Sequence, residues 1–209
     1  MMTEVKITYY GHSCFMLSTE KGSIVLDPYA EGSVPGTELP EGITADAVYC
    51  SHGHGDHNAA DRITLSGRPA PFEKTAITVP HDDKGGSLRG MSDINMFQIE
   101  DVKAVHFGDI GRDLTEEETA VLKGADIIMI PVGGYFTIDA GQAYRIMEQL
   151  SPALTILMHF RRGNSGYDVI AEVSDVKKVF KEAEDLDQPE YVYVKGAEKE
   201  KVIILKPFA

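Results

Sequence analysis

Apolar residues alternate with polar ones over short stretches in the first half of the chain, and glycine-rich segments separate these stretches. A period of two is typical of strands that bury one face. It predicts strands over 4–10, 14–19, 23–27, 46–51, 76–79, 94–99 and 102–107. Residues 20–22 predict a hairpin turn, and the proline- and glycine-rich residues 28–45 predict a long loop.

Helical patterns follow in the second half of the chain. Two capping boxes mark helix starts, Thr115 with Glu118 and Asp139 with Gln142. Helices are predicted over 115–123, 139–150 and 172–184, with a short helix from residue 58. The remaining strands are predicted at 125–132, which is apolar enough to be buried on both faces, at 154–158, and as a closing hairpin of 191–194 with 201–205. The pattern alone indicates a mixed α/β fold.

Four side chains able to bind a metal crowd into six positions directly after the strand predicted at 46–51. They are His52, His54, Asp56 and His57. Residues two apart in an extended segment project to the same side, so the first two can hold one ion together. The intervening glycines allow a sharp turn, beyond which the last two can face a second ion. A polar surface loop is the alternative, but only seven histidines occur in the chain, and three of them lie here.

The motif resembles the metal-binding signature of the metallo-β-lactamase-fold hydrolases. Further similarity is to the subgroup that contains L-ascorbate-6-phosphate lactonase and many metal-dependent hydrolases without a known substrate. The resemblance extends from about residue 5 to about residue 165. The segments that carry it are Ile7–Cys14, Ile24–Pro28, His52–His57, Val79–Asp82, His106–Gly111, Ile130–Asp139 and Leu157–Phe160.

This resemblance implies a four-layer αββα sandwich and two divalent metal ions. One ion would be bound by His52, His54 and His81 and the other by Asp56, His57 and His159, with Asp109 bridging both. Nitrogen and oxygen ligands suit zinc first, with manganese, iron and nickel as alternatives. A hydroxide shared by the ions would attack an ester, lactone, amide or phosphodiester of a small molecule. Asp56 would also act catalytically, by orienting the nucleophile and handling its proton.

Two further histidines have other expected roles. His12 lies early in the chain, in a Gly-His-Ser context that favours a structural or supporting role over metal binding. His106 lies three residues before Asp109, so the two would point to opposite faces of an extended strand, and a position in the core is expected. Tyr135, Phe136 and Arg161 adjoin the matched segments and either contact the substrate or serve packing and the solvated rim.

The composition of the chain indicates which classes of binding partner and which location to expect. Thirty-three acidic and 20 basic residues give a net charge of −13, which disfavours a nucleic acid partner because the basic residues are scattered. No apolar run reaches the roughly 20 residues of a membrane span, and no N-terminal leader pattern occurs, so a cytoplasmic protein is expected. No proline- or serine-rich linker divides the chain, which predicts one domain over residues 1–209. Cys14 and Cys50 are expected as buried, reduced thiols.

Two other classes of function fit the same ligands. One is a redox enzyme in which iron oxidises a small molecule, and the other is a metal-bound protein that binds a ligand without turnover. Metal content and colour separate them from the hydrolase. The sequence leaves open the substrate, the physiological metal, the oligomeric state, and whether residues 28–45 or 82–92 act as a lid.

Overall fold

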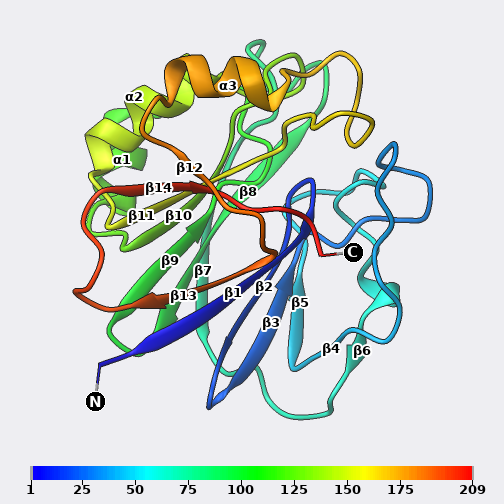
Figure 1. Ribbon diagram of the computed structural model, residues 1–209, viewed down its shortest axis with the longest axis vertical. Helices are drawn as coiled ribbons and strands as arrows, with labels where there is room; N and C mark the ends of the chain where they lie inside the picture. Colours follow the sequence, from blue (N-terminus) through cyan, green and yellow to red (C-terminus); the bar gives the residue numbers. More distant parts are fainter. Residues whose placement is uncertain (1, 209) are drawn as a thin grey trace.

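Two β-sheets packed face to face form the centre of the protein (Figure 1). The computed structural model describes residues 2–208. The first sheet has the strand order β13-β1-β2-β3-β5 within this range. Its members are β1 (Glu4–Gly11), β2 (Cys14–Thr19), β3 (Gly22–Leu26), β5 (Ala47–Tyr49) and β13 (Glu190–Val194). The first three strands form the antiparallel meander that the alternating pattern predicts.

The second sheet has the order β12-β14-β11-β10-β9-β8-β7 in the described part of the chain. Its members are β7 (Glu73–Pro80), β8 (Met91–Ile99), β9 (Val102–His106), β10 (Ile127–Pro131), β11 (Leu154–Met158), β12 (Glu184–Asp185) and β14 (Lys201–Ile204). Strands β9, β10, β11 and β14 run parallel, and every residue of β10 and β11 is buried. This is the burial expected of parallel strands covered on both faces.

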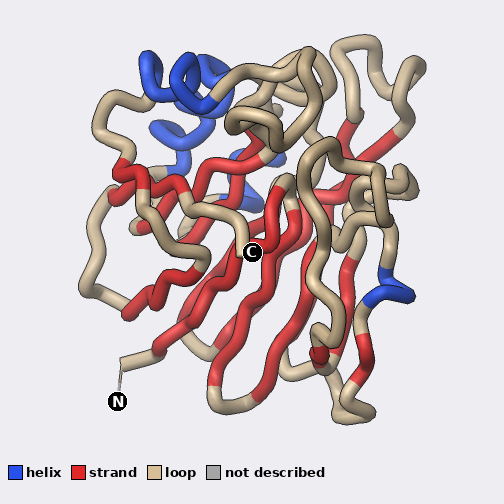
Figure 2. Tube along the Cα trace, turned by 45° about the vertical axis from the view of Figure 1, so that its right-hand side comes forward, coloured by secondary structure: helices blue, strands red, loops and turns tan. Residues whose placement is uncertain are grey.

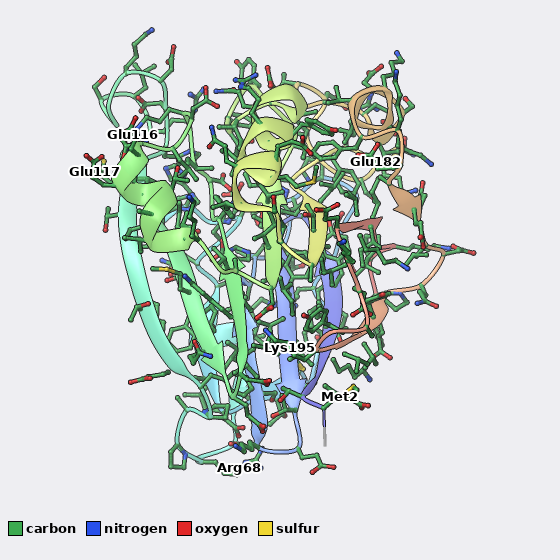
Figure 3. The ribbon with its side chains drawn as sticks, turned by 90° about the vertical axis from the view of Figure 1, so that its left-hand side faces the viewer. Met2, Arg68, Glu116, Glu117, Glu182 and Lys195 are labelled. Atoms are coloured by element: carbon green, nitrogen blue, oxygen red, sulfur yellow. The ribbon has the colours of Figure 1, made fainter. Side chains whose placement is uncertain are left out.

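Helices cover the outer face of the second sheet (Figures 1 and 2). They are α1 (Glu116–Leu122), α2 (Ala140–Leu150) and α3 (Val173–Val179). Both predicted capping boxes are present, at Thr115 and at Asp139. The exposed side chains of Glu116 and Glu117 project from α1 on the side away from the sheet (Figure 3), so this acidic run is part of the solvated surface.

The outer face of the first sheet is covered by coil and short elements. These are residues 28–43, β4 (Thr44–Ala45), η1 (Ala60–Arg62) and β6 (Thr64–Leu65). They bury a small apolar cluster against the sheet, which includes Tyr10, Val25, Tyr29 and Leu39. The expected αββα sandwich is therefore confirmed, with one of its outer layers built mainly of loop.

Three details of the predicted elements are wrong. The segments 191–194 and 201–205 form no hairpin, because β13 pairs with β1 and β14 pairs with β11 and β12 in the other sheet. The helix predicted over 172–184 ends at Val179, since Phe180 leaves helical geometry and is buried in the core. The helix expected from residue 58 is only the single turn of η1, because Ile63 is already extended toward β6.

Candidate metal centre

The histidine-rich motif lies in the loop that follows β5. A turn closes between His54 and His57, where the N–H of His57 donates to the carbonyl of His54 at 2.9 Å. Gly55 accepts a backbone hydrogen bond from Ala30 at 2.8 Å, which ties the motif to the loop over the first sheet. The motif is thus held by a turn of its own and by a hydrogen bond from the loop over the first sheet.

The other three predicted ligands lie just beyond strands of the second sheet. His81 follows β7, Asp109 follows β9 by three residues, and His159 follows β11, and all three are buried. Gly108 has φ +52°, and a Cβ there would lie 2.7 Å from the Cβ of Ser51. Only glycine fits this turn, which brings Asp109 next to the histidine motif.

All seven predicted metal-binding residues come together in space. Their ligand atoms fall into three overlapping groups, and within each group all atoms lie within 4.8 Å of one another. The groups are His52, His54 and His81; His12, Asp56, His57 and His159; and His52, His57 and Asp109. Asp109 lies between the first two groups, because its Oδ2 is 3.3 Å from His57 Nε2, 3.5 Å from His81 Nε2 and 3.2 Å from His159 Nε2.

Buried polar atoms at this place lack hydrogen-bond partners among the described residues. They include His52 Nε2, His57 Nε2, His159 Nε2 and Asp109 Oδ1. An unpaired buried polar group costs about 1–3 kcal/mol, and most such groups in proteins are paired. Several lone pairs that converge without donors fit a bound cation, and imidazole with carboxylate is a donor set that zinc accepts. The residues therefore fit the metal ions that the motif predicts.

Asp27 orients His57 directly and His52 through Ser51. This buried carboxylate accepts hydrogen bonds from His57 Nδ1 at 2.7 Å and from the Ser51 hydroxyl at 2.6 Å. Ser51 Oγ in turn lies 3.0 Å from His52 Nδ1. When each ring is neutral, these bonds keep its proton on Nδ1, so that Nε2 is free to bind a metal ion. Asp27 is not among the site residues predicted from the sequence, although an Asp-Pro pair at the end of a buried strand marks its position.

Asp56 is held by two side chains from distant parts of the chain. His12 Nε2 and the hydroxyl of Tyr167 each lie 3.2 Å from its Oδ2. His12 and His159 both have φ +55°, the N–H of His159 donates to the carbonyl of His12 at 2.9 Å, and their rings are 4.1 Å apart. The supporting position expected for His12 agrees with these contacts, although its ring also lies within reach of the second group. Tyr167 lies in a loop without periodicity and was not anticipated.

Burial and charge shift the pKa values of the site in the metal-free protein. Burial lowers the pKa of His52 to about 3 and that of His12 to about 4. Burial would also lower the pKa of His57, but the carboxylates of Asp109 and Asp27 outweigh it and raise this pKa well above the ordinary value. Burial opposes ionisation of Asp109, yet His159 and His57 hold its pKa well below the usual range. In the metal-free protein the surroundings thus favour the neutral form of His12 and His52 and the protonated form of His57.

The remaining candidates divide between core and rim. His106 is fully buried, with Nε2 2.9 Å from the carbonyl of Ser13 and Nδ1 accepting from the N–H of Gly108, as expected for a core residue. Arg161 forms an ion pair with Glu172 at 3.1 Å and so serves local structure. Tyr135 is exposed and Phe136 is half-buried, with their rings 4.8 Å apart.

Both cysteines are free, and among residues 2–208 no helix is long and apolar enough to cross a membrane.

A Beta-lactamase superfamily domain matches residues 6–159. Metal-dependent hydrolases of Carboxydothermus hydrogenoformans and Archaeoglobus fulgidus are 27% and 25% identical, over 75% and 97% of this chain and 84% and 96% of theirs. A Thermotoga maritima structure described as a Zn-dependent hydrolase of the metallo-beta-lactamase superfamily has a TM-score of 0.74 and 26% identity, covering 96% of this chain and 97% of its own.

Proposed function

Because the chain belongs to the metallo-beta-lactamase superfamily, we propose that it is a hydrolase whose centre holds two divalent metal ions. The observation that carries the proposal is the convergence of seven ligand side chains with unpaired buried nitrogen and oxygen atoms. The first ion would be held by His52, His54 and His81. The second would be held by Asp56, His57 and His159, and Asp109 lies between the two sets of ligands.

Bound divalent ions supply an acidified water, with a pKa near 7, and a positive charge that polarises the substrate oxygen. The chain supplies the positioning. His12 and Tyr167 hold one carboxylate oxygen of Asp56, which would direct the other oxygen toward the second ion and the water bound there, so that Asp56 could orient that water and take its proton. Asp27 and Ser51 fix the ring orientations of His57 and His52. Esters, lactones, amides and phosphodiesters of small molecules fit this chemistry, and the net charge of −13 favours them over nucleic acid.

Metal analysis of protein purified without an affinity metal, paired with turnover assays, tests the proposal. We expect two equivalents of zinc, or of manganese, per chain. We also expect hydrolysis of at least one lactone, ester or phosphodiester, which chelation abolishes and added metal restores. Stoichiometric iron with oxidation of a small molecule would replace the hydrolase by a redox enzyme. Bound metal without any turnover would favour a binding protein, and no metal after reconstitution would contradict the ligand assignment.

Metal affinity and turnover are expected to fall together below about pH 6, because imidazole binds metal only in its neutral form. His57 sharpens this dependence. The carboxylates of Asp109 and Asp27 raise its pKa well above the ordinary value, so the metal-free ring takes up a proton at a higher pH than a free imidazole does, and a cation must displace that proton. A lower pH favours the protonated ring and therefore weakens binding. Calorimetric zinc titrations at pH 7 in two buffers of different ionisation enthalpy should show proton release, and unchanged affinity and turnover at pH 5 would contradict the assignment.

A further inference from the structure

Arg89 has no polar partner for its guanidinium group among residues 2–208. The other six arginines each donate to a carboxylate or a carbonyl: Arg62, Arg68, Arg112, Arg145, Arg161 and Arg162. The Arg89 guanidinium instead lies over two aromatic rings, 5.3 Å from the centroid of Phe136 and 5.8 Å from that of Tyr135. A free, half-buried cation is unusual in a chain of net charge −13.

The loop that carries Arg89 is fixed at its base. The buried carboxylate of Asp82 accepts the backbone N–H groups of Lys84, Gly86, Leu88 and Arg89 at 2.8–2.9 Å. The next residue, Gly90, accepts a hydrogen bond from the N–H of His81 at 3.0 Å. These bonds favour a fixed rim over a moving lid. They also place the Arg89 backbone directly beside a candidate metal ligand.

The aromatic rings beneath Arg89 form a wall along the metal centre. The Phe136 ring is 5.4 Å from the ring of Tyr167, and the Tyr167 hydroxyl reaches Asp56. The wall therefore begins near His81 and ends at Asp56. Tyr135 is 66% exposed and has φ +58°, a backbone conformation that bulky residues rarely adopt. An exposed aromatic ring held in strain beside a candidate active site indicates a role in binding.

We propose that Arg89, Tyr135 and Phe136 form a substrate subsite that binds a small molecule carrying a carboxylate or phosphate group next to a flat apolar part. The inference rests on the proposed hydrolase and names its substrate class. Guanidinium presents five donors in a plane that matches either anion, and in Arg89 none of these donors is used within the described residues. The exposed part of the Tyr135 ring takes the apolar part, while the scissile bond lies toward Asp56. Arg161 is less suited, because Glu172 already neutralises it.

Binding of benzoate, phenyl phosphate and the neutral probe benzyl alcohol to the zinc-loaded protein tests the subsite by calorimetry. We expect Arg89→Gln to bind the preferred anion at least about tenfold more weakly, because a hydrogen bond to a charged group is lost. The neutral probe should bind as it does to the native protein, which shows that the site is intact. Arg89→Lys keeps the positive charge but loses the planar pair of N–H donors, so we expect it to bind the anion with an affinity between those of the native protein and Arg89→Gln. Comparison of the two anions identifies the group that the site prefers.

Arg145→Gln is the matched control, since this arginine makes an exposed ion pair with Asp113. It removes the same charge and should leave binding of both anions unchanged. Equal anion affinity in Arg89→Gln and the native protein would overturn the subsite. If the loaded protein hydrolyses no substrate, the proposed function fails while the affinity ratio still decides the role of Arg89. For a hydrolysed anionic substrate, Arg89→Gln should raise KM with little change in kcat.

Discussion

Replacing Asp109 with alanine is expected to remove one or both metal ions and to lower kcat/KM by about 10³-fold. The reason is position: its Oδ2 lies within 3.5 Å of nitrogen atoms from His57, His81 and His159, which belong to both proposed ion sites. Without this carboxylate, each proposed ion would lose a ligand and the negative charge that would offset two neighbouring cations. Elemental analysis should show two equivalents in the native protein and one or none in the variant.

Asp113→Ala provides the control for this experiment. Asp113 is exposed and pairs with Arg145, so its removal should leave metal content and turnover unchanged. Circular dichroism must show that the Asp109 variant is folded, because the substitution also removes the buried charge that lies 3.3 Å from His57 Nε2. A folded variant that keeps two equivalents of metal would mean that Asp109 does not bridge the ions.

The geometry of the centre was predictable to the extent that ligands follow strands. His52 to His57 stand out by density, and His81, Asp109 and His159 each follow an apolar run whose end is easy to place. Loops at strand ends of a rigid scaffold are where binding groups gather. No comparable pattern marks Tyr167, which reaches Asp56 from an irregular loop whose path depends on tertiary contacts.

The errors in the fold have a common physical origin. The runs 191–194 and 201–205 are apolar enough for strands, but this pattern does not specify which sheet edge they join. β13 completes the first sheet beside β1, whereas β14 joins the second beside β11. In the same way, the amphipathic pattern after residue 172 continues past the end of α3, where burial of Phe180 ends the helix.

Asp27→Asn is expected to destabilise the protein by about 3 kcal/mol and to weaken metal binding by about 10- to 100-fold. The native carboxylate is fully buried and accepts from Ser51 N and Oγ at 2.6 Å and from His57 Nδ1 at 2.7 Å. An amide of the same size has one acceptor oxygen and two donors. At least one of the three native donors would then face an N–H group, and the His57 ring would lose its orientation.

Asp46→Asn separates the two effects of this substitution. Asp46 also accepts hydrogen bonds, from Ser23 N in β3 and from Ser66 Oγ and Arg68 after β6. Arg68 lies at the end of the molecule opposite α1, which carries Glu116 (Figure 3). Asp46 comes directly before β5, whereas the metal-binding motif, residues 52–57, follows this strand. Urea unfolding with a chelator present should show lower stability for both variants, while zinc titration should show weaker binding only for Asp27→Asn. Native zinc affinity in a folded Asp27→Asn protein would show that Asp27 supports the sheet and does not orient the ligands.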